Sequence, residues 1–337
     1  MSLRRKSCET CFKGKRKCDL TFPICKRCRR IGKECHYTYS VLSDEEATPL
    51  DSTGVIEQQN KQYAQRTLTL DIPNFLGPLG EVRPIVGQSV SWQWLVDELK
   101  HYPRTFAAAG TTNFIHSAFA PSRNDSLKVA SNLCLARQLA PSNHAHHIIF
   151  RKIASEVAVL LNNTTASPIL QELAQLQAIV LYQIMRLLCG GFEERILAEA
   201  QEPAVETLCI RLLDRVNTEF GFVQANWQTW LVAESARRTA LVAFLLYCTY
   251  CLETYGSSTA FPTMSMLPVS NRPELWESPA TFLPQLDSAA SYDDFSQLWL
   301  TNPYRQLDAF EKMLLVPCKG LDTIESYRRC AEQSQGT

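Results

Sequence analysis

Apolar side chains recur every three to four positions through most of the chain after residue 90, which is the spacing of one helix face. One such face is formed by Trp92, Leu95, Val96, Leu99 and Tyr102, and a second by Phe150, Ile153, Val157, Leu160 and Leu161. A third helix is predicted to begin at Ser167-Pro168, an N-cap followed by proline at the first helical position, and to end at Gly190-Gly191. Its apolar set is Leu173, Leu176, Val180, Ile184 and Leu187, and further helices are expected over 203–217 and 228–254. Because alternating strand patterns are almost absent, the pattern predicts an all-α domain.

The pattern also predicts how the chain is divided. Residues 1–37 are rich in cysteine and basic residues, whereas residues 38–68 are polar and show neither a hydrophobic period nor a heptad seam. We therefore expect a small N-terminal domain over 1–37, a linker over 38–68 and an all-α regulatory domain over 69–337, with irregular structure in its proline-rich stretch 257–285.

Charge is distributed unevenly along the 337 residues, although the net charge is zero. Residues 1–40 hold 12 Lys and Arg against three acidic residues, so the remainder of the chain carries a balance of −9. A basic head on an acidic body indicates a polyanionic partner for the head alone.

Hydropathy argues against a membrane protein. No apolar segment follows the basic N-terminus, so we expect no secretory signal. The longest apolar run, at 240–252, is shorter than a bilayer span and is typical of a buried helix. The expected compartment is therefore reducing, where clustered cysteines bind metal more often than they form disulfides.

Six of the 13 cysteines form a two-fold repeat of the pattern C-x2-C-x6-C, joined by a six-residue connector. The repeat consists of Cys8, Cys11, Cys18, Cys25, Cys28 and Cys35. A structural zinc ion takes four tetrahedral ligands, so one ion would leave two thiolates unused. Two ions can share six sulfurs if two thiolates bridge, and the pseudo-symmetry assigns Cys8 and Cys25 as the bridges. A disulfide-linked cluster and a redox or metal-storage role are the alternatives.

A module of this size has little apolar core, so metal must supply its folding energy. Structural zinc typically contributes about 10–16 kcal/mol in peptides of this kind. Six thiolates on two divalent ions leave a net charge of −2, which the surrounding Lys and Arg help to balance.

These residues resemble the fungal binuclear zinc-cluster DNA-binding domain of the Zn(II)2-C6 type. The resemblance covers about residues 7–37, and it includes the basic run before Cys18, Asp19 after it, Pro23, and Gly32 in the last gap. It implies a small metal-stabilised domain of two short helices, with two Zn2+ ions per chain and double-stranded DNA as the partner.

The resemblance also implies how DNA is read. In this family the first short helix points its carboxyl end into the major groove, and the lysine four positions after the second cysteine, here Lys15, meets a CGG triplet. Guanine offers two acceptors there. The other DNA-binding residues implied or expected are Lys13, Arg16, Lys17, Lys26, Arg27 and Arg29. Phe12 and Gly14 depart from the usual basic pattern, and Gly14 is expected to loosen the helix.

The helical body is similar, over about 90–285, to the regulatory region of fungal zinc-cluster activators, often those that govern secondary-metabolite gene clusters. The matching segments are 92–116, 176–188, 227–247 and 274–278. This resemblance implies a ligand-responsive or partner-binding all-α module.

Other motifs have simpler interpretations. Cys248 and Cys251 have metal-like spacing but lie in an apolar helix, and we expect them to be buried core residues. The histidines at 144, 146 and 147 are expected at a polar helix start. Arg237 and Arg238 should form structural ion pairs or lie exposed. No catalytic or nucleotide-binding motif appears, so an enzyme is not expected.

Together these observations predict a nuclear, sequence-specific transcription factor of RNA polymerase II genes, an activator that binds CGG-type sites. Its basic run would also serve as a nuclear localisation signal. Transcription machinery or coactivators are expected partners, a homodimer is left open, and no membrane contact is expected. The alternative is an accessory coregulator whose cluster mediates protein contacts.

Overall fold

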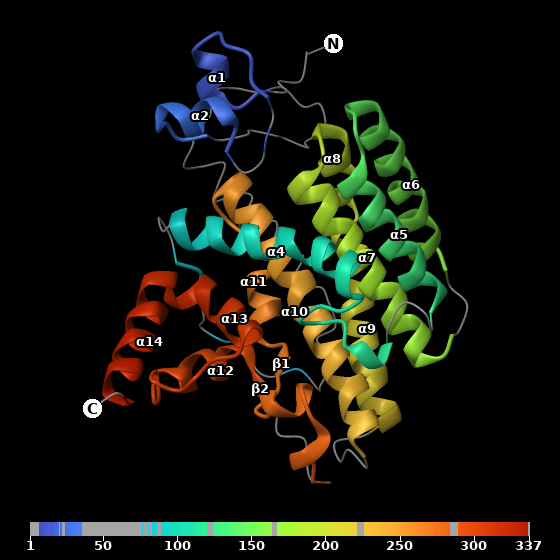
Figure 1. Cartoon of the computed structure of the whole chain (residues 1–337), viewed down its shortest axis with the longest axis vertical. Coiled ribbons are helices and arrows are strands. Elements are labelled where there is room, and N and C mark those ends of the chain that lie inside the picture. The colour runs from blue at the N-terminus through green and yellow to red at the C-terminus, as the bar shows by residue number, and fades with distance from the viewer. Residues whose placement is uncertain are drawn as a thin grey trace.

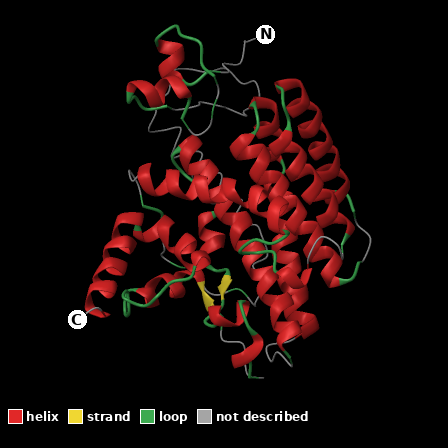
Figure 2. Ribbon diagram, in the orientation of Figure 1, coloured by secondary structure: helices red, strands yellow, loops and turns green. Residues whose placement is uncertain are grey.

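The computed structural model describes residues 7–19, 21, 24–35, 76, 80, 83–85, 89–119, 124–163, 167–220, 226–283 and 289–335. Helices dominate these residues, and the two strands, β1 (Pro268–Val269) and β2 (Ala290–Ser291), form one short antiparallel pair (Figure 2). The prediction of a small two-helix module and a mostly α-helical body is therefore confirmed. The predicted linker and both of its boundaries lie outside the described residues.

The cysteine-rich module contains two short helices, and the body contains a larger set (Figure 1). In the module these are α1 (Glu9–Lys13) and α2 (Lys26–Ile31). In the body they are α4 (Ser89–Ala109), α5 (Asp125–Leu139), α6 (Asn143–Leu161), α7 (Ile169–Cys189), α8 (Phe192–Ala200), α9 (Glu202–Phe220), α10 (Trp227–Tyr255), α11 (Phe261–Ser265), α12 (Tyr292–Trp299), α13 (Ala309–Lys319) and α14 (Leu321–Gln335). Short 3-10 turns lie at Ser117–Phe119, Pro273–Trp276 and Pro279–Thr281.

Two long helices, α7 and α10, form the centre of the body. Both are buried around most of their circumference, because α7 packs against α4, α5, α9 and α10, while α10 also packs against α4 and α9 (Figure 1). A helix that is apolar all round must be enclosed by others. The run at 240–252 therefore lies inside the core, as predicted. No helix in the described ranges is long and apolar enough to cross a membrane.

Local sequence signals set the ends of α10. Asn226 and Thr229 form a capping box at its start, and Gly256 ends it with a left-handed backbone conformation (φ +76°) that glycine adopts without penalty. For α7, the predicted stop at Gly190 is confirmed, but the predicted start is wrong by one position. Pro168 is itself the N-cap, with an extended backbone, and the helix begins at Ile169.

The expected roles of several body residues are confirmed. Cys248 is fully buried and Cys251 is 8% exposed. The histidines at 144, 146 and 147 lie in the first turns of α6, which begins at Asn143.

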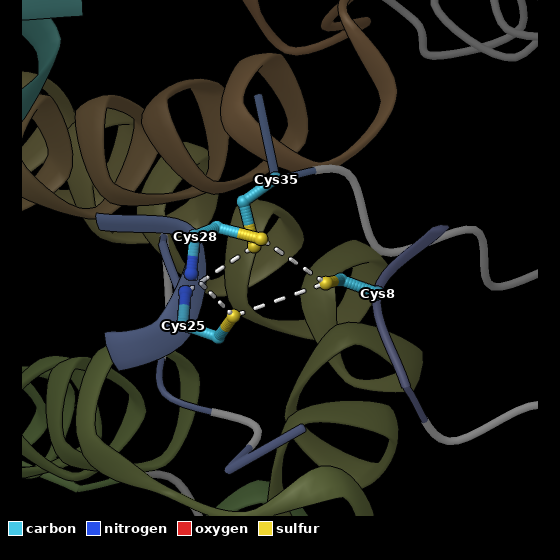
Figure 3. A group of neighbouring side chains, drawn as sticks. All are labelled: Cys8, Cys25, Cys28 and Cys35. Atoms are coloured by element: carbon cyan, nitrogen blue, oxygen red, sulfur yellow. Dashed lines mark hydrogen bonds between the residues drawn. The ribbon is translucent and has the colours of Figure 1, made fainter. Parts of the chain in front are cut away.

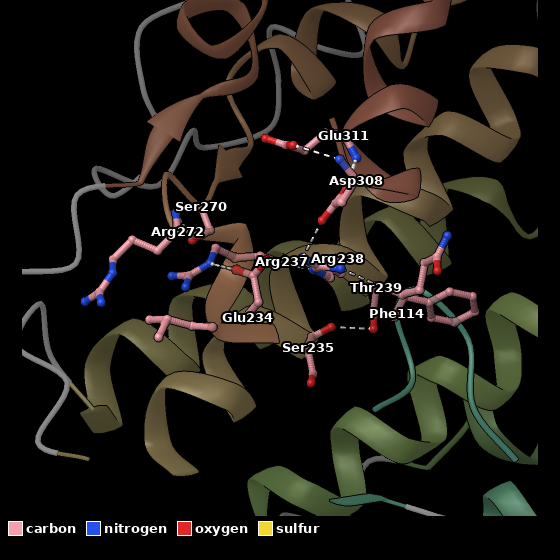
Figure 4. A network of polar contacts seen from close by, with 12 residues as sticks. Phe114, Glu234, Ser235, Arg237, Arg238, Thr239, Ser270, Arg272, Asp308 and Glu311 are labelled. Atoms are coloured by element: carbon pink, nitrogen blue, oxygen red, sulfur yellow. Dashed lines mark hydrogen bonds and ion pairs between the residues drawn. The ribbon is translucent and has the colours of Figure 1, made fainter. Parts of the chain in front are cut away.

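A buried group of charged side chains lies on α10 (Figure 4). Nε of Arg237 lies 2.9 Å and Nε of Arg238 lies 2.8 Å from the two carboxylate oxygens of Glu234. The guanidinium carbon of Arg238 lies 4.1 Å from the ring centre of Trp276 and 4.5 Å from that of Phe310. Both arginines are therefore structural ion-pair partners of Glu234, and the aromatic faces further compensate Arg238 for its loss of hydration.

Candidate metal centre and nucleic-acid interface

The two halves of the module repeat one local structure. Cys8 is the N-cap of α1 and Cys25 is the N-cap of α2, each with an extended backbone. The Cys8 sulfur accepts a hydrogen bond from the backbone N–H of Cys11 at 3.4 Å, and the Cys25 sulfur accepts one from Cys28 at 3.3 Å. A helix N-terminus favours negative charge, so both bridging candidates lie where a thiolate is stabilised.

The six sulfurs form two overlapping groups of four. Cys8, Cys11, Cys18 and Cys25 form one group, and Cys8, Cys25, Cys28 and Cys35 form the other, with all ligand atoms of a group within 4.8 Å of one another. Figure 3 shows the sulfurs of the second group facing one another. The residues shared by the two groups are Cys8 and Cys25, the pair that the pseudo-symmetry of the sequence selects as bridges.

The sulfur spacings fit zinc. A zinc–sulfur bond is about 2.3 Å long, so two ligands on one tetrahedral ion are about 3.8 Å apart. The separations are 3.9 Å between Cys8 and Cys25, 3.7 Å between Cys8 and Cys28, and 3.6 Å between Cys11 and Cys25. The donor set and its geometry therefore suit a binuclear cluster of two zinc ions.

Thiols packed this closely resist ionisation when no cation is present. Burial and neighbouring thiols raise the pKa of Cys28 to about 11, and burial raises the pKa values of Cys11 and Cys35. Burial acts in the same direction at Cys25, but hydrogen bonds from Cys28, Cys11 and Cys35 outweigh it and lower its pKa to about 7. Bound divalent cations would hold Cys11, Cys28 and Cys35 as thiolates.

Further contacts hold the two halves together. Oγ1 of Thr10 donates a hydrogen bond to the carbonyl oxygen of Glu34, which links α1 to the residue before the last cysteine. Oδ1 of Asp19 accepts a hydrogen bond from the backbone N–H of Lys26 at 3.0 Å, at the start of α2. Asp19 was expected from the family resemblance alone, and its position in the sequence does not reveal this contact.

The predicted DNA-binding residues lie at two places in the module. Lys13 ends α1, Lys15, Arg16 and Lys17 follow it, and Lys26, Arg27 and Arg29 lie on α2. Arg27 is half-buried and the other six are exposed. Nζ of Lys13 lies 3.1 Å from a carboxylate oxygen of Glu9, a surface pair that contributes little to stability.

Lys15 has an unusual backbone conformation. Its φ is +50°, and it is the one non-glycine residue of the described chain with a positive φ. The backbone N–H after it, on Arg16, bonds to the carbonyl oxygen of Cys11, a Schellman-type closure of α1. In the second half the equivalent position is Gly32, with φ +60°, and the N–H of Lys33 bonds to Cys28 in the same way. A lysine thus occupies the position where its own repeat has glycine.

Gly14 has a different role from the expected one. It is the C-cap of α1, with φ −80°, and so it lies beyond the helix and does not loosen it. A Cβ atom at this position would lie 3.1 Å from the carbonyl oxygen of Thr10, closer than such contacts normally are. Glycine therefore allows the tight turn that presents Lys15. Phe12, the other residue that departs from the family's basic pattern, lies on α1 with 47% of its surface exposed.

Comparison with known proteins identifies the N-terminal module. Residues 6–43 match the fungal Zn(2)-Cys(6) binuclear cluster domain. The chain is also similar to the transcription factor gsfR2 of Penicillium aethiopicum, with 26% identity over 335 aligned positions that cover 78% of this chain and 79% of the relative. That coverage extends well beyond the module into the helical body. No solved structure matches the chain.

These findings confirm the resemblance of the N-terminal module and the prediction of two zinc ions per chain. The matched relative is a transcription factor and not an enzyme, which confirms the prediction that an enzyme is not expected.

Proposed function

We propose that this chain, which carries a fungal Zn(2)-Cys(6) binuclear cluster domain, is a nuclear, sequence-specific DNA-binding regulator of transcription. One observation carries the proposal above the others. Six cysteine sulfurs form two groups of four that share Cys8 and Cys25, and they join two short helices. Exposed basic side chains lie at the end of α1, in the turn after it and along α2. A rigid, metal-supported module of this kind holds its basic side chains in fixed positions, where they can bind a polyanion.

The cysteines and the backbone keep the module folded around its metal. When bound, the two zinc ions supply the cross-links that a module with almost no apolar core lacks. The chain's own contribution is to position the sulfurs at the helix starts and to donate backbone N–H groups to Cys8, Cys25 and Cys35. Loss of the metal would therefore remove the support of every basic residue at once.

The basic residues divide into two proposed roles. Lys26, Arg27 and Arg29 on α2 bind phosphates and fix the orientation of the module on the duplex. Arg16 and Lys17 continue from the end of α1 and contact bases or phosphates. If these five residues neutralise five phosphates, the logarithm of the binding constant should fall with the logarithm of salt concentration at a slope of about −4.5.

Lys15 is the proposed reader of a CGG triplet. Guanine presents N7 and O6 as acceptors in the major groove, and a lysine ammonium donates to both. The left-handed backbone of Lys15 supports this role, because strain of this kind in a non-glycine residue is retained where its side chain has a use. A glycine at this position, as in the second half, would relieve the strain but present no side chain.

The wider role follows from the relative and from the resemblance of the helical body. We place the protein among regulators of RNA polymerase II genes, as an activator of a metabolic or secondary-metabolite gene cluster. The basic run of the module serves as the nuclear localisation signal. The helical body recruits transcription machinery or coactivators, and a homodimer would bind two half-sites.

Binding-site selection with the zinc-loaded full chain tests the proposal. Random duplexes are enriched over several rounds, and the selected pool is sequenced. The proposal predicts a CGG-containing motif, single or paired, that disappears when the zinc is removed. A pool with no enriched motif would contradict sequence-specific binding and support the alternative, a coregulator whose cluster contacts proteins.

A further inference from the structure

A hollow of about 330 Å³ opens between the two central helices of the body, away from the cysteine module. Its walls come from α7, from the first turns of α10 and from the 3-10 turn at Ser117–Phe119. The lining residues are Ala118, Phe119, Asn124, Leu170, Leu173, Ala174, Gln177, Trp227, Gln228, Leu231 and Val232. All of them belong to the described chain, and none of them carries a charge.

One side of the hollow follows a single face of α7. Leu170, Leu173, Ala174 and Gln177 are three or four positions apart, so they lie along a line about 10 Å long. Leu170, at one end, is 47% exposed, whereas Gln177, at the other end, is fully buried. The hollow therefore has an apolar entrance and a polar inner end.

The polar group at the inner end has an unused acceptor. Nε2 of Gln177 lies 2.9 Å from the carbonyl oxygen of Phe114 and 3.5 Å from Oγ1 of Thr239. The Thr239 hydroxyl donates its own hydrogen to the carbonyl oxygen of Ser235, so it can only accept from Gln177 (Figure 4). Both neighbours are acceptors, which fixes the amide with its nitrogen toward them.

The oxygen of the same amide, Oε1, is buried and has no hydrogen-bond partner within the described protein. A buried acceptor without a donor costs free energy, so natural structures provide a partner for nearly all of them. Gln177 is one of the residues that line the hollow, which is large enough to hold a molecule with such a donor.

From these features we propose that the hollow is a binding site for a neutral, flat, largely aromatic molecule with one hydrogen-bond donor at its inner end. The rings of Phe119 and Trp227 and the aliphatic side chains form the walls, Gln177 Oε1 accepts from the ligand's hydroxyl or N–H group, and the absence of lining charge disfavours an ion. A cavity of about 150 Å³ holds one benzene ring, so a hollow of about 330 Å³ has room for about 13 non-hydrogen atoms, or two fused rings. None of its lining residues belongs to the cysteine module.

Paired probes test the proposal on the full chain. 2-Naphthol and 2-methylnaphthalene have the same ring system and nearly the same size, but only the naphthol has a donor. Calorimetry or equilibrium dialysis should show saturable binding of both, with the naphthol bound roughly tenfold more tightly because of its hydrogen bond. Gln177→Met keeps the side-chain length without the amide oxygen, and it should abolish this preference.

Two further variants show where the probe binds. Ala174→Phe fills the middle of the hollow and should remove binding of both probes. If that variant unfolds, Leu170→Trp at the exposed entrance provides the same test at a position where folding is not at stake. Thermal unfolding without probe and retention of DNA binding serve as controls for both.

Several results would overturn the proposal. These are an absence of saturable binding up to the solubility limit of the naphthol, equal affinity for the two probes, or binding that survives the blocking variants. A naphthol preference that persists in Gln177→Met would place the donor elsewhere and would also contradict it.

Discussion

Replacing Lys15 by glycine should strengthen zinc retention and weaken binding to a CGG site at the same time. Lys15 has φ +50°, in a region where an L-residue is strained and glycine is not. Its side chain is exposed, and its backbone closes α1 as Gly32 closes α2. The substitution thus removes a strain and a proposed base contact together.

The gain in zinc retention and the loss of affinity for the CGG site can be estimated separately. A left-handed conformation costs an L-residue about 1–2 kcal/mol, and part of this is offset by the greater freedom of glycine in the unfolded chain. A net gain of about 1 kcal/mol corresponds to about a fivefold increase in the overall zinc-binding constant. Loss of a good contact to guanine costs about 1–3 kcal/mol, or roughly 5- to 150-fold in affinity for the CGG duplex.

Both effects are measured on the full chain. Competition with a chelator measures zinc retention, and fluorescence anisotropy with a labelled duplex measures affinity for the CGG site. Lys15→Ala separates the causes, because alanine keeps the strain but removes the ammonium. It should lose CGG affinity as glycine does, with no gain in zinc retention. Loss on a duplex without the triplet should be small for both variants.

Gly32→Ala is the matched control in the other half of the module. Its φ is +60° and no atom lies within 4 Å of the added Cβ, so the substitution adds strain without a clash. It should weaken zinc retention by an amount similar to the gain in Lys15→Gly. Faster loss of zinc from Lys15→Gly than from the wild type would contradict the proposed strain at Lys15. Unchanged affinity of Lys15→Ala for the CGG duplex would contradict the proposed base contact.

Four further results are expected. Cys25→Ser removes a ligand common to both sulfur groups and should abolish stable binding of both ions, whereas Cys18→Ser should leave one, as counted by native mass spectrometry. Chelation should unfold the module and abolish specific DNA binding but leave most of the circular dichroism of the helical body, and a collapse of that signal would contradict the division of the chain. Acidification from about pH 7.5 to 5.5 should release zinc. Without metal, the pKa of the Cys28 thiol is raised to about 11, so this thiol takes up a proton when zinc leaves, and the affinity for zinc therefore falls as the pH falls. Arg238→Met should lower the free energy of unfolding of the body by about 3 kcal/mol in denaturant, because it removes one of the partners of the buried Glu234 carboxylate. Lys152→Met, which breaks the exposed pair with Glu156, should change the free energy of unfolding little.

The cysteine spacing predicted the metal centre because a thiolate cluster is a local feature. The two halves lie within 28 residues of chain, each C-x2-C pair is one turn of helix, and ligand counting leads directly to two shared sulfurs. The amphipathic faces of α4 and α6 were predictable for a related reason, since burial of one face requires a regular period.

Features that depend on backbone conformation or on distant residues could not be predicted. The left-handed backbone of Lys15 comes from a turn that glycine usually forms, so residue type misleads there. Gln177 looks like any polar residue on a helix, and its free oxygen appears only when Phe114 and Thr239, both more than 60 positions away, occupy its nitrogen. The contacts of Arg238 could be predicted only in part. Helical spacing suggests Glu234 as its partner, but the rings of Trp276 and Phe310 are distant in the sequence.

We propose above all that the zinc-supported basic residues of the module read DNA sequence. The most direct measurement is the ratio of dissociation constants of the zinc-loaded full chain for two duplexes that differ only in a CGG triplet and its AAA replacement, at one stated salt concentration. If the module reads sequence, the ratio should be at least about 10³ for a paired site, within the range of specific over non-specific binding. A ratio near one, with tight binding to both duplexes, would show that the module binds DNA without reading its sequence.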